Sequence, residues 1–462
     1  MREMWMLAPV LFPVISGAAL WIWNPGRTRM RAAAAVLSLG EAVCSWLAIL
    51  NCMEMRLPLW NIGPGMELCF KLDGIGALFS GLASLIWVLV VFFAFEYMEH
   101  ETEEARFFGC LIMSLGALTG VAYAGNFVTL YLFFEMMTFF SVPLVFHSRK
   151  REALRAGMVY LAYSMLGASI ALGGYFFFRR YAFGTDFRAG GILMGEAGPV
   201  LPAVFCMAAG FSCKAGLMPL HPWLPIAHPV APAPASAVLS GLITKAGVVA
   251  VIRVVYHMAG PEILRGTWVQ YVLLSMEGLY GSLLQMVFHA LAKNALFLCA
   301  GAVICKTGCT RIKDLKGMGR RMPSVMVCFA LASLSLVGIP PAGGFLAKWH
   351  LAVGAMRAGA GLFVWLGPVV LMVSALLTAG YLFPVIVEAF FPGRDWQDSA
   401  KPKADKPEAG KWGEGGWSGA GAVTVSLFMG MPLAVLGISL LVLGAVGNPV
   451  FECLRGIASA MV

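Results

Sequence analysis

The chain has 462 residues, of which 60% are apolar and only 12% are charged, and its formal net charge is +9. Soluble globular domains carry about 25% charged residues, so this composition excludes that class and predicts a polytopic membrane protein. We interpret the modest positive balance as a bias of the loops toward one side of a membrane, and not as a nucleic-acid footprint.

Apolar runs of about 20 residues, the length that a bilayer core requires, recur along the whole sequence. The N-terminal run is too long for a signal peptide and lacks a clear cleavage site, so we keep it as the first span. We expect an all-α membrane protein with about twelve crossings, within a range of about 12–14. The runs lie near residues 5–23, 32–52, 74–95, 107–124, 126–146, 156–178, 199–220, 235–257, 282–304, 324–354, 361–387 and 424–446.

Two of these regions contain residues that interrupt a helix. Six prolines lie between Pro219 and Pro234, and each removes a backbone donor and disfavours a helix interior. The tenth run contains the sequence Gly-Ile-Pro-Pro-Ala-Gly-Gly at 338–344. Broken backbone is tolerated at membrane depth only where it is buried in protein or lines a cavity. We therefore expect discontinuous helices near 215–235 and 338–344.

Lysine and arginine gather in four connections, near 27–31, 149–155, 306–321 and 401–411. With twelve crossings these connections all lie on the same side, which the positive-inside rule assigns to the cytoplasm. The prediction is a multi-pass protein of the cytoplasmic (inner) membrane with its N- and C-termini outside. The acidic segment 96–106 on the inner side is an exception to this bias.

Two further segments are not predicted to cross. Residues 260–281 have a short apolar core that contains Glu277, and counting them as a span would move the basic connection 306–321 to the other side. We interpret them as an interfacial or re-entrant piece. Residues 394–418 are rich in Lys, Gly, Asp and Glu, a composition typical of a flexible linker.

Ionisable residues inside the spans are the candidate functional residues, because a charge at bilayer depth is costly and usually faces a polar pathway. Glu135 in the fifth span is either a carboxyl that is hydrogen-bonded locally or the partner of a buried lysine. Lys214 in the seventh span is the candidate partner. A glutamate–lysine pair whose strength depends on protonation nearby would act as a switch.

Lys245 lies well inside the eighth span and has no acidic residue on its own helix, which argues against snorkelling to the interface. His289 and Lys293 are four residues apart and therefore share a helical face. A lone histidine is more often a satisfied core residue, but beside a lysine it is equally a candidate relay member. Lys348 follows the glycine–proline break, where it fits the end of a relay that opens to solvent.

His221 and His228 flank the proline-rich connector, and either proton entry or capping of the broken helix explains them equally well. The eleven cysteines are scattered singly, whereas clusters and metal sites need grouped ligands, so no metal site is expected. No dinucleotide-binding fingerprint or P-loop is present. We therefore expect no cofactor bound by this chain and no catalytic redox residue of its own.

Residues 211–253 resemble the signature of the antiporter-like subunits of respiratory complex I. The same fold occurs in Mrp-type multisubunit sodium/proton antiporters and in energy-converting membrane-bound hydrogenases. The resemblance extends from about Gly74 to Val387. Further segments match the family in the expected order, namely LYLFFEMMTFFSVPLVFH, FHALAKNALFLCAGAVI, DLKGMGRRMP and GIPPAGGFLAKWHL.

The resemblance implies roles for the same residues. It places the switching pair on Glu135 and Lys214 and the central lysine on Lys245. The remaining roles fall on the relay positions His289 and Lys293 and on the terminal Lys348.

The chain also departs from the family pattern. Two spans that normally lie between the eighth and ninth runs are not found, which predicts an inverted-repeat fold with a shortened second repeat. The acidic residue that often precedes the connector histidine is replaced by Ile226 and Ala227. The expected division is N-terminal helices (1–105), a first repeat (106–258), a shortened second repeat (259–390), a cytoplasmic linker (391–423) and a C-terminal helix with a tail (424–462).

We therefore expect a proton-translocating, or sodium-translocating, membrane subunit of a redox-driven pump such as an NADH or ferredoxin:quinone oxidoreductase or an energy-converting hydrogenase. Expected partners are the lipid bilayer, other membrane-arm subunits including further antiporter-like ones, and a peripheral redox module, without nucleic acid. One alternative is a subunit of an Mrp-type sodium/proton antiporter. Another is a structural subunit of the membrane arm that has lost transport.

Overall fold

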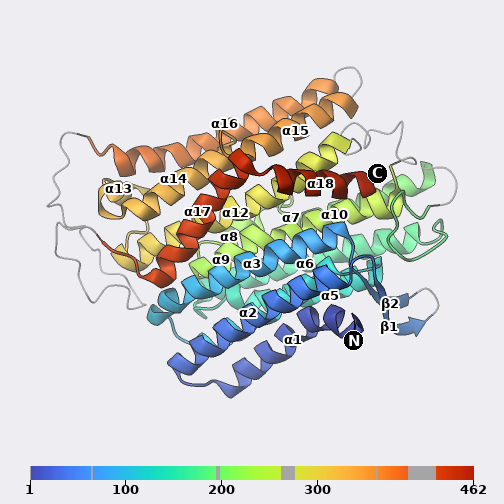
Figure 1. Cartoon of the computed structure of the whole chain (residues 1–462), viewed down its shortest axis with the longest axis horizontal. Coiled ribbons are helices and arrows are strands. Elements are labelled where there is room, and N and C mark those ends of the chain that lie inside the picture. Colours follow the sequence, from blue (N-terminus) through green and yellow to red (C-terminus); the bar gives the residue numbers. More distant parts are fainter. Residues whose placement is uncertain are drawn as a thin grey trace.

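The computed structural model describes residues 2–63, 66–193, 198–261, 276–358, 363–393 and 423–461. Figure 1 shows one bundle of helices that run roughly along the long axis of the molecule. Within the described residues, ten helices are long and apolar enough to cross a membrane. This confirms the predicted all-α polytopic fold, and the remaining two expected crossings are built from shorter helices that are interrupted.

The N-terminal group consists of four helices. They are α1 (Arg2–Trp23), α2 (Arg27–Asn51), α3 (Gly74–Tyr97, followed by the short η1, Met98–His100) and α4 (Glu104–Ala122). Helix α1 packs along α4 and α2 along α3. A Cβ atom on Gly17 would lie 2.7 Å from the backbone oxygen of Gly109, so these small residues let the two backbones approach closely, as is common between membrane helices.

The middle of the chain contains the first interrupted helix. Helices α5 (Phe127–Val145) and α6 (Arg151–Phe178) lead through η2 (Gly198–Val200) into α7 (Leu201–Ala215), which ends at Gly216 in the left-handed conformation. The short α8 (Trp223–Ala227) follows the break and also packs on α6. One continuous helical stretch then runs through α9 (Ala233–Val238), the π-helical turn η3 (Leu239–Ile243), α10 (Thr244–Ile252) and the π-helical segment η4 (Arg253–Ala259). The predicted discontinuity near 215–235 is thus confirmed.

The C-terminal half contains the second interruption. Its elements are α12 (Met276–Thr307), η5 (Ile312–Leu315), α13 (Met318–Arg321), α14 (Pro323–Val337), α15 (Gly343–Ala358), α16 (Phe363–Phe390), α17 (Leu427–Val446) and α18 (Asn448–Met461). Helix α14 ends at Gly338, again in the left-handed conformation, and α15 begins five residues after it. The predicted break at 338–344 is confirmed.

Two predicted non-crossing segments fall partly or wholly outside the described residues. Of the predicted interfacial piece 260–281, residues 262–275 lie outside them, and residues 276–281 belong to the first turns of α12. Glu277 therefore lies at the start of this long helix and not in a separate surface piece. The predicted linker 394–418 lies outside the described residues.

A short antiparallel hairpin, β1 (Arg56–Gly63) and β2 (Met66–Lys71), connects α2 to α3 and was not predicted. It lies at one end of the bundle, which we call the hairpin end (Figure 1). The opposite end carries the basic connections near 27–31, 149–155 and 306–321, together with α13, and we call it the basic end. The hairpin is anchored to the helices because the Cys69 N–H donates to Thr129 Oγ1 at 2.9 Å.

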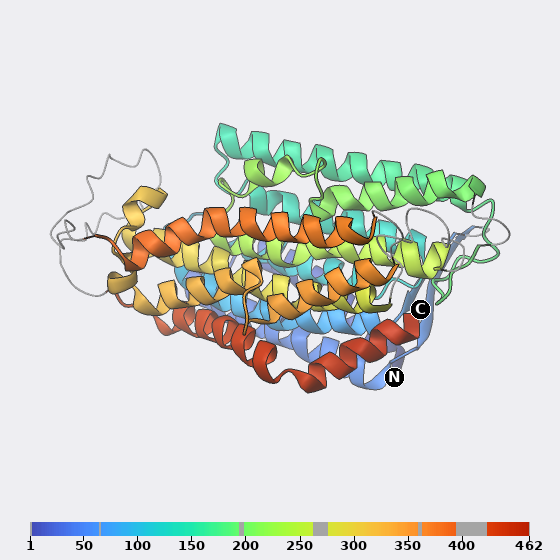
Figure 2. The same cartoon turned by 90° about the horizontal axis from the view of Figure 1, so that it is seen from above.

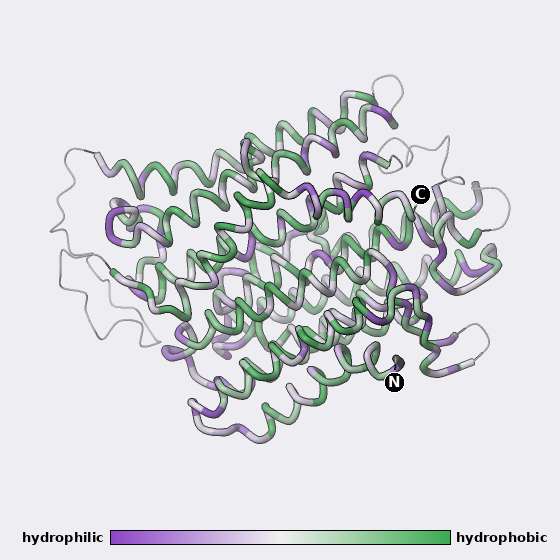
Figure 3. The backbone as a smooth tube through the Cα atoms, in the orientation of Figure 1, coloured by the Kyte–Doolittle hydropathy of each residue, from purple (hydrophilic) through white to green (hydrophobic). Residues whose placement is uncertain are grey.

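The distribution of polarity agrees with a bundle that spans a membrane. Figure 3 shows apolar residues along the helices and hydrophilic residues mainly toward the two ends, with isolated polar positions between them. Helix α16 exposes many large apolar side chains, including Trp365, Val370 and Leu376, as a lipid-facing helix does. The protein is a multi-pass integral membrane protein.

Helix α18 continues after α17 along the flank of the bundle toward the hairpin end (Figure 2). Its buried residues are Leu454, Ala458 and Met461, so one face packs against the bundle while the other is exposed. Phe451 reaches Phe288 of α12, with ring centroids 6.4 Å apart. The sequence analysis predicted only a tail here.

Candidate functional site

Lys214 lies in the last turn of α7, just before the helix breaks, and is only 1% exposed. Its ammonium group donates three hydrogen bonds to hydroxyl oxygens: Thr138 Oγ1 at 2.8 Å, Tyr160 Oη at 2.6 Å and Ser164 Oγ at 3.1 Å. The ammonium also lies 4.2 Å from the centre of the Tyr160 ring. Because an ammonium has three N–H donors, neutral groups satisfy Lys214 completely.

Glu135 of α5 is the predicted partner of Lys214. The two residues interact electrostatically. Among the described residues, however, no ion pair with a nitrogen–oxygen distance of 4.0 Å or less joins them. Glu135 is only partly buried, whereas Lys214 points into its hydroxyl cage. The structure thus brings the pair into one neighbourhood without closing a salt bridge, because Thr138, one turn after Glu135, takes up one of the lysine donors.

Lys245 is the second residue of α10, which follows the π-helical turn η3 directly, and it is 5% exposed. Its ammonium donates to the Ser240 backbone oxygen at 2.6 Å and to Thr244 Oγ1 at 3.2 Å. A π-helical turn widens the helix and is frequent at functional sites. Here it supplies a carbonyl for an ammonium group that has no acidic partner on its own helix.

Helix α12 carries His289 and Lys293, which lie one turn apart as predicted. His289 interacts electrostatically with Lys245, Lys293 and Lys348, which come from three different helices. Neither His289 nor Lys293 makes a direct hydrogen bond or ion pair with another described residue. We call these four residues the lysine–histidine cluster.

Lys348 of α15 reaches back across the break to the end of α14. Its ammonium donates to the backbone oxygens of Leu336 at 2.8 Å and Val337 at 2.7 Å. The last carbonyls of a helix have no partner within the helix and carry partial negative charge. Lys348 therefore stabilises the broken helix end, and it is at the same time an electrostatic neighbour of His289.

The two connector histidines, for which the sequence left proton entry and capping of the broken helix equally open, are in different surroundings. His221 is exposed. Both ring nitrogens of His228 are buried without a hydrogen-bond partner, and its ring lies 4.8 Å from that of Phe297 on α12. His228 is an electrostatic neighbour of Lys245 and Lys293, so its position links it to the lysine–histidine cluster and not to the surface.

A second group of buried charges lies at the hairpin end and was missed by the sequence analysis. Arg253, whose side chain is 1% exposed, forms an ion pair and two hydrogen bonds with the carboxylate of Asp73. Asp73 caps α3 by accepting from the Gly76 N–H at 3.0 Å, and His257 Nε2 lies 4.0 Å away. Burial would raise the pKa of the Asp73 carboxyl, but the charge and hydrogen bonds of Arg253 outweigh it, and the pKa falls to about 2.

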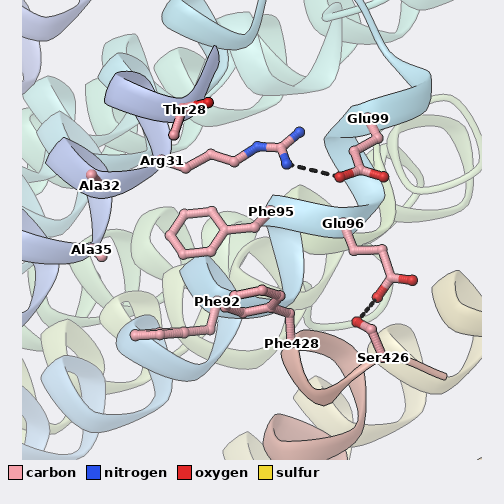
Figure 4. A pocket seen from close by; sticks show the side chains of 10 residues that line it. All are labelled: Thr28, Arg31, Ala32, Ala35, Phe92, Phe95, Glu96, Glu99, Ser426 and Phe428. Atoms are coloured by element: carbon pink, nitrogen blue, oxygen red, sulfur yellow. Dashed lines mark hydrogen bonds and ion pairs between the residues drawn. The ribbon is translucent and has the colours of Figure 1, made fainter.

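The basic end contains a pocket of about 500 Å³ between α2, α3 and α17, lined by three phenylalanine rings, two alanines and several polar side chains (Figure 4). At its rim, Arg31 Nη1 donates to Glu99 Oε1 at 2.8 Å. Glu96 pairs with Lys306 of α12 and accepts from the Ser426 hydroxyl before α17. These contacts join α2, α3, α12 and the residue before α17, and none of the residues belongs to the lysine–histidine cluster.

The described residues contain no group of three or more His, Cys, Asp and Glu side chains placed to hold a metal ion. What the site does contain is a set of buried and half-buried basic groups, of which Lys214, Lys245 and Lys348 donate to hydroxyl and carbonyl oxygens. Such groups take up and release protons, and they repel metal cations.

Comparison with known proteins agrees with this geometry. The model of the family "NADH:quinone oxidoreductase/Mrp antiporter, TM" matches residues 124–276 and 266–376, which include the whole lysine–histidine cluster. The chain belongs to this family. The model "NADH-Ubiquinone oxidoreductase (complex I), chain 5 N-terminus" matches residues 62–108.

Several curated members of the family are similar over most of the chain. NADH-quinone oxidoreductase subunit N of Desulforudis audaxviator is 30% identical, over 79% of this chain and 78% of the relative. An Na(+)/H(+) antiporter subunit of Alkalihalophilus pseudofirmus is 24% identical over 76% of this chain and 80% of the relative. Hydrogenase-4 component B of Escherichia coli is 28% identical, over 62% of this chain and half of the relative.

Solved structures share the fold along nearly the whole length. A chain of the Mrp complex of Dietzia sp. DQ12-45-1b matches with a TM-score of 0.80 and 21% identity, covering 99% of this chain and 97% of that one. A chain of an archaeal membrane-bound sulfane sulfur reductase gives 0.81 at 18% identity, covering 100% and 98%. A chain of respiratory complex I of Thermus thermophilus gives 0.72 at 19% identity, covering 99% and 100%.

Proposed function

We propose that this chain is a proton-translocating subunit in the membrane arm of a complex I-related, redox-driven pump. The parent complex would be an NADH or ferredoxin:quinone oxidoreductase or an energy-converting hydrogenase, and this chain would bind no redox cofactor itself. The names of the relatives support this assignment, since they include a quinone oxidoreductase subunit and a hydrogenase component. Its partners would be other membrane subunits, including further antiporter-like ones, and a peripheral redox module.

The observation that carries the proposal is the position of His289 among three lysines that have no acidic partner within the part of the chain that the structure describes. Two unit charges 4 Å apart in a protein interior repel by about 4 kcal/mol at an effective dielectric constant of 20. Mutual repulsion between neighbouring basic groups therefore disfavours the state in which all of them are charged at once. A proton that arrives at one member favours the release of a proton from another, which is what a relay requires.

Lys214 would connect this relay to the driving reaction. In the hydroxyl cage its hydrogen bonds all go to neutral groups, and a movement toward Glu135, its electrostatic neighbour, would bring it into a salt bridge. Such an exchange of partners changes the electric field at Lys245, which begins the relay. His228 would take part as an inner member of the path, because its buried nitrogens lie near Lys245 and Lys293. Lys348 would be the last member.

The test is ion pumping by the whole parent assembly in proteoliposomes. The matched variants are Lys245→Ala and Lys313→Ala, which remove a buried lysine and an exposed lysine of η5. Lys245→Ala is expected to lower pumping by about a hundredfold, the scale of a lost proton-transfer group, and Lys313→Ala to leave it unchanged. Undiminished pumping by an assembled Lys245→Ala complex would mean that this chain is structural and that its neighbours carry the protons.

A second candidate function is a subunit of an Mrp-type sodium/proton antiporter. It is favoured by the similarity to the antiporter protein of Alkalihalophilus pseudofirmus, which extends over 80% of that relative. The two functions differ in what drives the ion movement. Proton uptake that follows an imposed sodium gradient without an electron donor would support the antiporter. Uptake that needs electron transfer would support the redox-driven pump.

A further inference from the structure

The pocket at the basic end is a groove between two helices that do not pack along each other. Helices α2 and α17 each pack on α3, so α3 forms the floor of the groove and the other two form its walls. The α2 wall carries the small side chains of Ala32 and Ala35, which leave the groove open. The groove lies where three spans end, since α2 begins at Arg27, α3 ends at Tyr97 and α17 begins at Leu427. It is therefore at the depth of the membrane–water interface.

Three phenylalanine rings form the deeper part of the groove (Figure 4). Phe92 and Phe95 belong to the last two turns of α3, and Phe428 belongs to the first turn of α17. The Phe428 ring centroid lies 6.5 Å from that of Phe92 and 5.9 Å from that of Phe95, so the rings make one continuous apolar surface. Water is absent from the hydrocarbon region of a bilayer, and such a surface is covered there by an acyl chain or by protein.

Charged side chains line the end of the groove that is nearer the aqueous phase. Glu99 lies in η1, seven residues after Phe92, which places it about 10 Å closer to the end of the bundle. Arg31 Nη1 donates to Glu99 Oε1 at 2.8 Å in an exposed position. Glu96, in contrast, is buried and already has the Lys306 ammonium and the Ser426 hydroxyl as partners. The groove thus presents one partly exposed cation and one exposed anion side by side, next to an apolar floor.

This gradient from charged to apolar side chains fits a phospholipid, and the charges select its headgroup. An anionic headgroup would bring its net negative charge beside both Glu96 and Glu99, which like charges disfavour. The choline headgroup has no N–H to donate to a carboxylate. The ethanolamine headgroup has a phosphate that accepts from an arginine and an ammonium that donates to a carboxylate. It therefore complements both exposed charges of the groove at once.

We propose that this groove binds one phosphatidylethanolamine molecule of the surrounding bilayer. The headgroup lies across the Arg31–Glu99 pair, with its phosphate on the guanidinium and its ammonium on the carboxylate. One acyl chain lies on the rings of Phe92, Phe95 and Phe428. The lipid joins α2 to α17, which otherwise share only their contact with α3. This site does not depend on the function proposed for the lysine–histidine cluster.

The test is lipid retention by the full chain. The protein is placed in nanodiscs that contain equal amounts of phosphatidylethanolamine, phosphatidylcholine and phosphatidylglycerol with identical acyl chains, then extracted in detergent and weighed by native mass spectrometry. The wild-type chain is expected to retain phosphatidylethanolamine in preference to the other two lipids. Glu99→Gln should lower its preference over phosphatidylcholine by about tenfold, the scale of one hydrogen bond to a charged group. Glu152→Gln, at an exposed position of α6 near the same end, should leave the preference unchanged.

A second variant tests the position of the acyl chain. Ala35→Phe fills the groove and should abolish the retention of phosphatidylethanolamine, whereas Ala434→Phe, at an exposed position of α17 outside the pocket, should not. Glu99 is exposed, so its variant keeps the test usable if Ala35→Phe does not fold.

Three outcomes would overturn the proposal. Equal retention of the three lipids, or a preference for phosphatidylglycerol, would contradict the headgroup assignment. Retention that survives both Glu99→Gln and Ala35→Phe would place the lipid elsewhere on the protein. A wild-type chain that retains no lipid would mean that protein covers the groove. Because every readout is the mass of a bound lipid, each of these failures is distinct from a failure of the proposed ion pumping.

Discussion

Two groups of buried charges lie on the same helical stretch from Ala233 to Ala259 and are held in opposite ways. Arg253 makes a bidentate contact with Asp73 at the hairpin end. Lys245, eight residues earlier, has only a carbonyl and a hydroxyl as partners and faces further basic groups. The first arrangement fixes a charge in place. The arrangement around Lys245 lets the lysine lose its proton without leaving an opposite charge buried and unpaired. A proton relay needs this property.

The largest expected effect is on the paired group. Arg253→Ala leaves the Asp73 carboxylate buried and uncompensated, and breaking a buried ion pair in this way costs about 3–5 kcal/mol. Thermal unfolding in lipid or detergent should show this loss, and adding Asp73→Asn should recover part of it. Arg188→Ala, at an exposed position of the same end, is the control. If both arginine variants unfold alike, the Asp73–Arg253 pair does not brace the bundle.

The same pair should make the protein sensitive to strong acid. The pKa of Asp73 is lowered from 3.8 to about 2 in the folded protein. Its contribution, about 2 kcal/mol, is therefore fully present above pH 4 and is lost as the pH falls toward 2. Unfolding temperatures measured from pH 6 to pH 2 should fall more steeply for the wild-type chain than for Asp73→Asn. Parallel curves would mean that other carboxyls dominate the acid response.

Lys214 is intermediate between the two arrangements: all three of its hydrogen bonds go to neutral hydroxyls, but it has an acidic neighbour in Glu135. Tyr160→Phe removes one acceptor and leaves an N–H of the buried ammonium without a partner, which costs about 1–3 kcal/mol. It should also favour the movement of Lys214 toward Glu135 and so change pumping. Tyr163→Phe on the same helix is the control, at a half-buried position. A stability equal to that of the control would show that the cage is dispensable.

The smallest effect on stability is expected at Lys245. Methionine has a similar length and fills the same space without a polar group, and such replacements of buried charges are often neutral or stabilising. Lys245→Met should therefore change the free energy of unfolding by less than about 1 kcal/mol. A loss of several kcal/mol would make Lys245 a structural residue and remove the contrast with Arg253.

The membrane helices were predictable from the sequence because the length and polarity of each run follow from the thickness of a bilayer. Both helix interruptions were also predictable from local sequence, because proline and glycine residues lie at the breaks. The β1–β2 hairpin was missed although Gly63, Pro64 and Gly65 lie between two short alternating runs. That pattern is typical of a hairpin, but both runs are much shorter than a membrane span.

The site was predictable as a set of residues but not as a set of contacts. Lys245, His289, Lys293 and Lys348 stand out because each is a charge in an apolar run. That Lys214 binds three hydroxyls depends on how α5, α6 and α7 pack, which no single stretch of sequence contains. Asp73 and Arg253 are 180 residues apart in the sequence. Their pairing depends on how the helices pack and could not be predicted from either segment alone.

The π-helical turn before Lys245 has a consequence for insertions and deletions. A π turn accommodates one residue more than an α-helical turn, and each residue of an α-helix rotates the chain by about 100°. Deleting Gly241, whose missing side chain leaves room for Asn294 of α12, would restore the α-helical register. The lysine ammonium would then turn about a quarter of the circumference away from His289. The direction in which this ammonium points thus depends on how many residues the turn contains. Substitutions do not change that number, so only insertions and deletions test it.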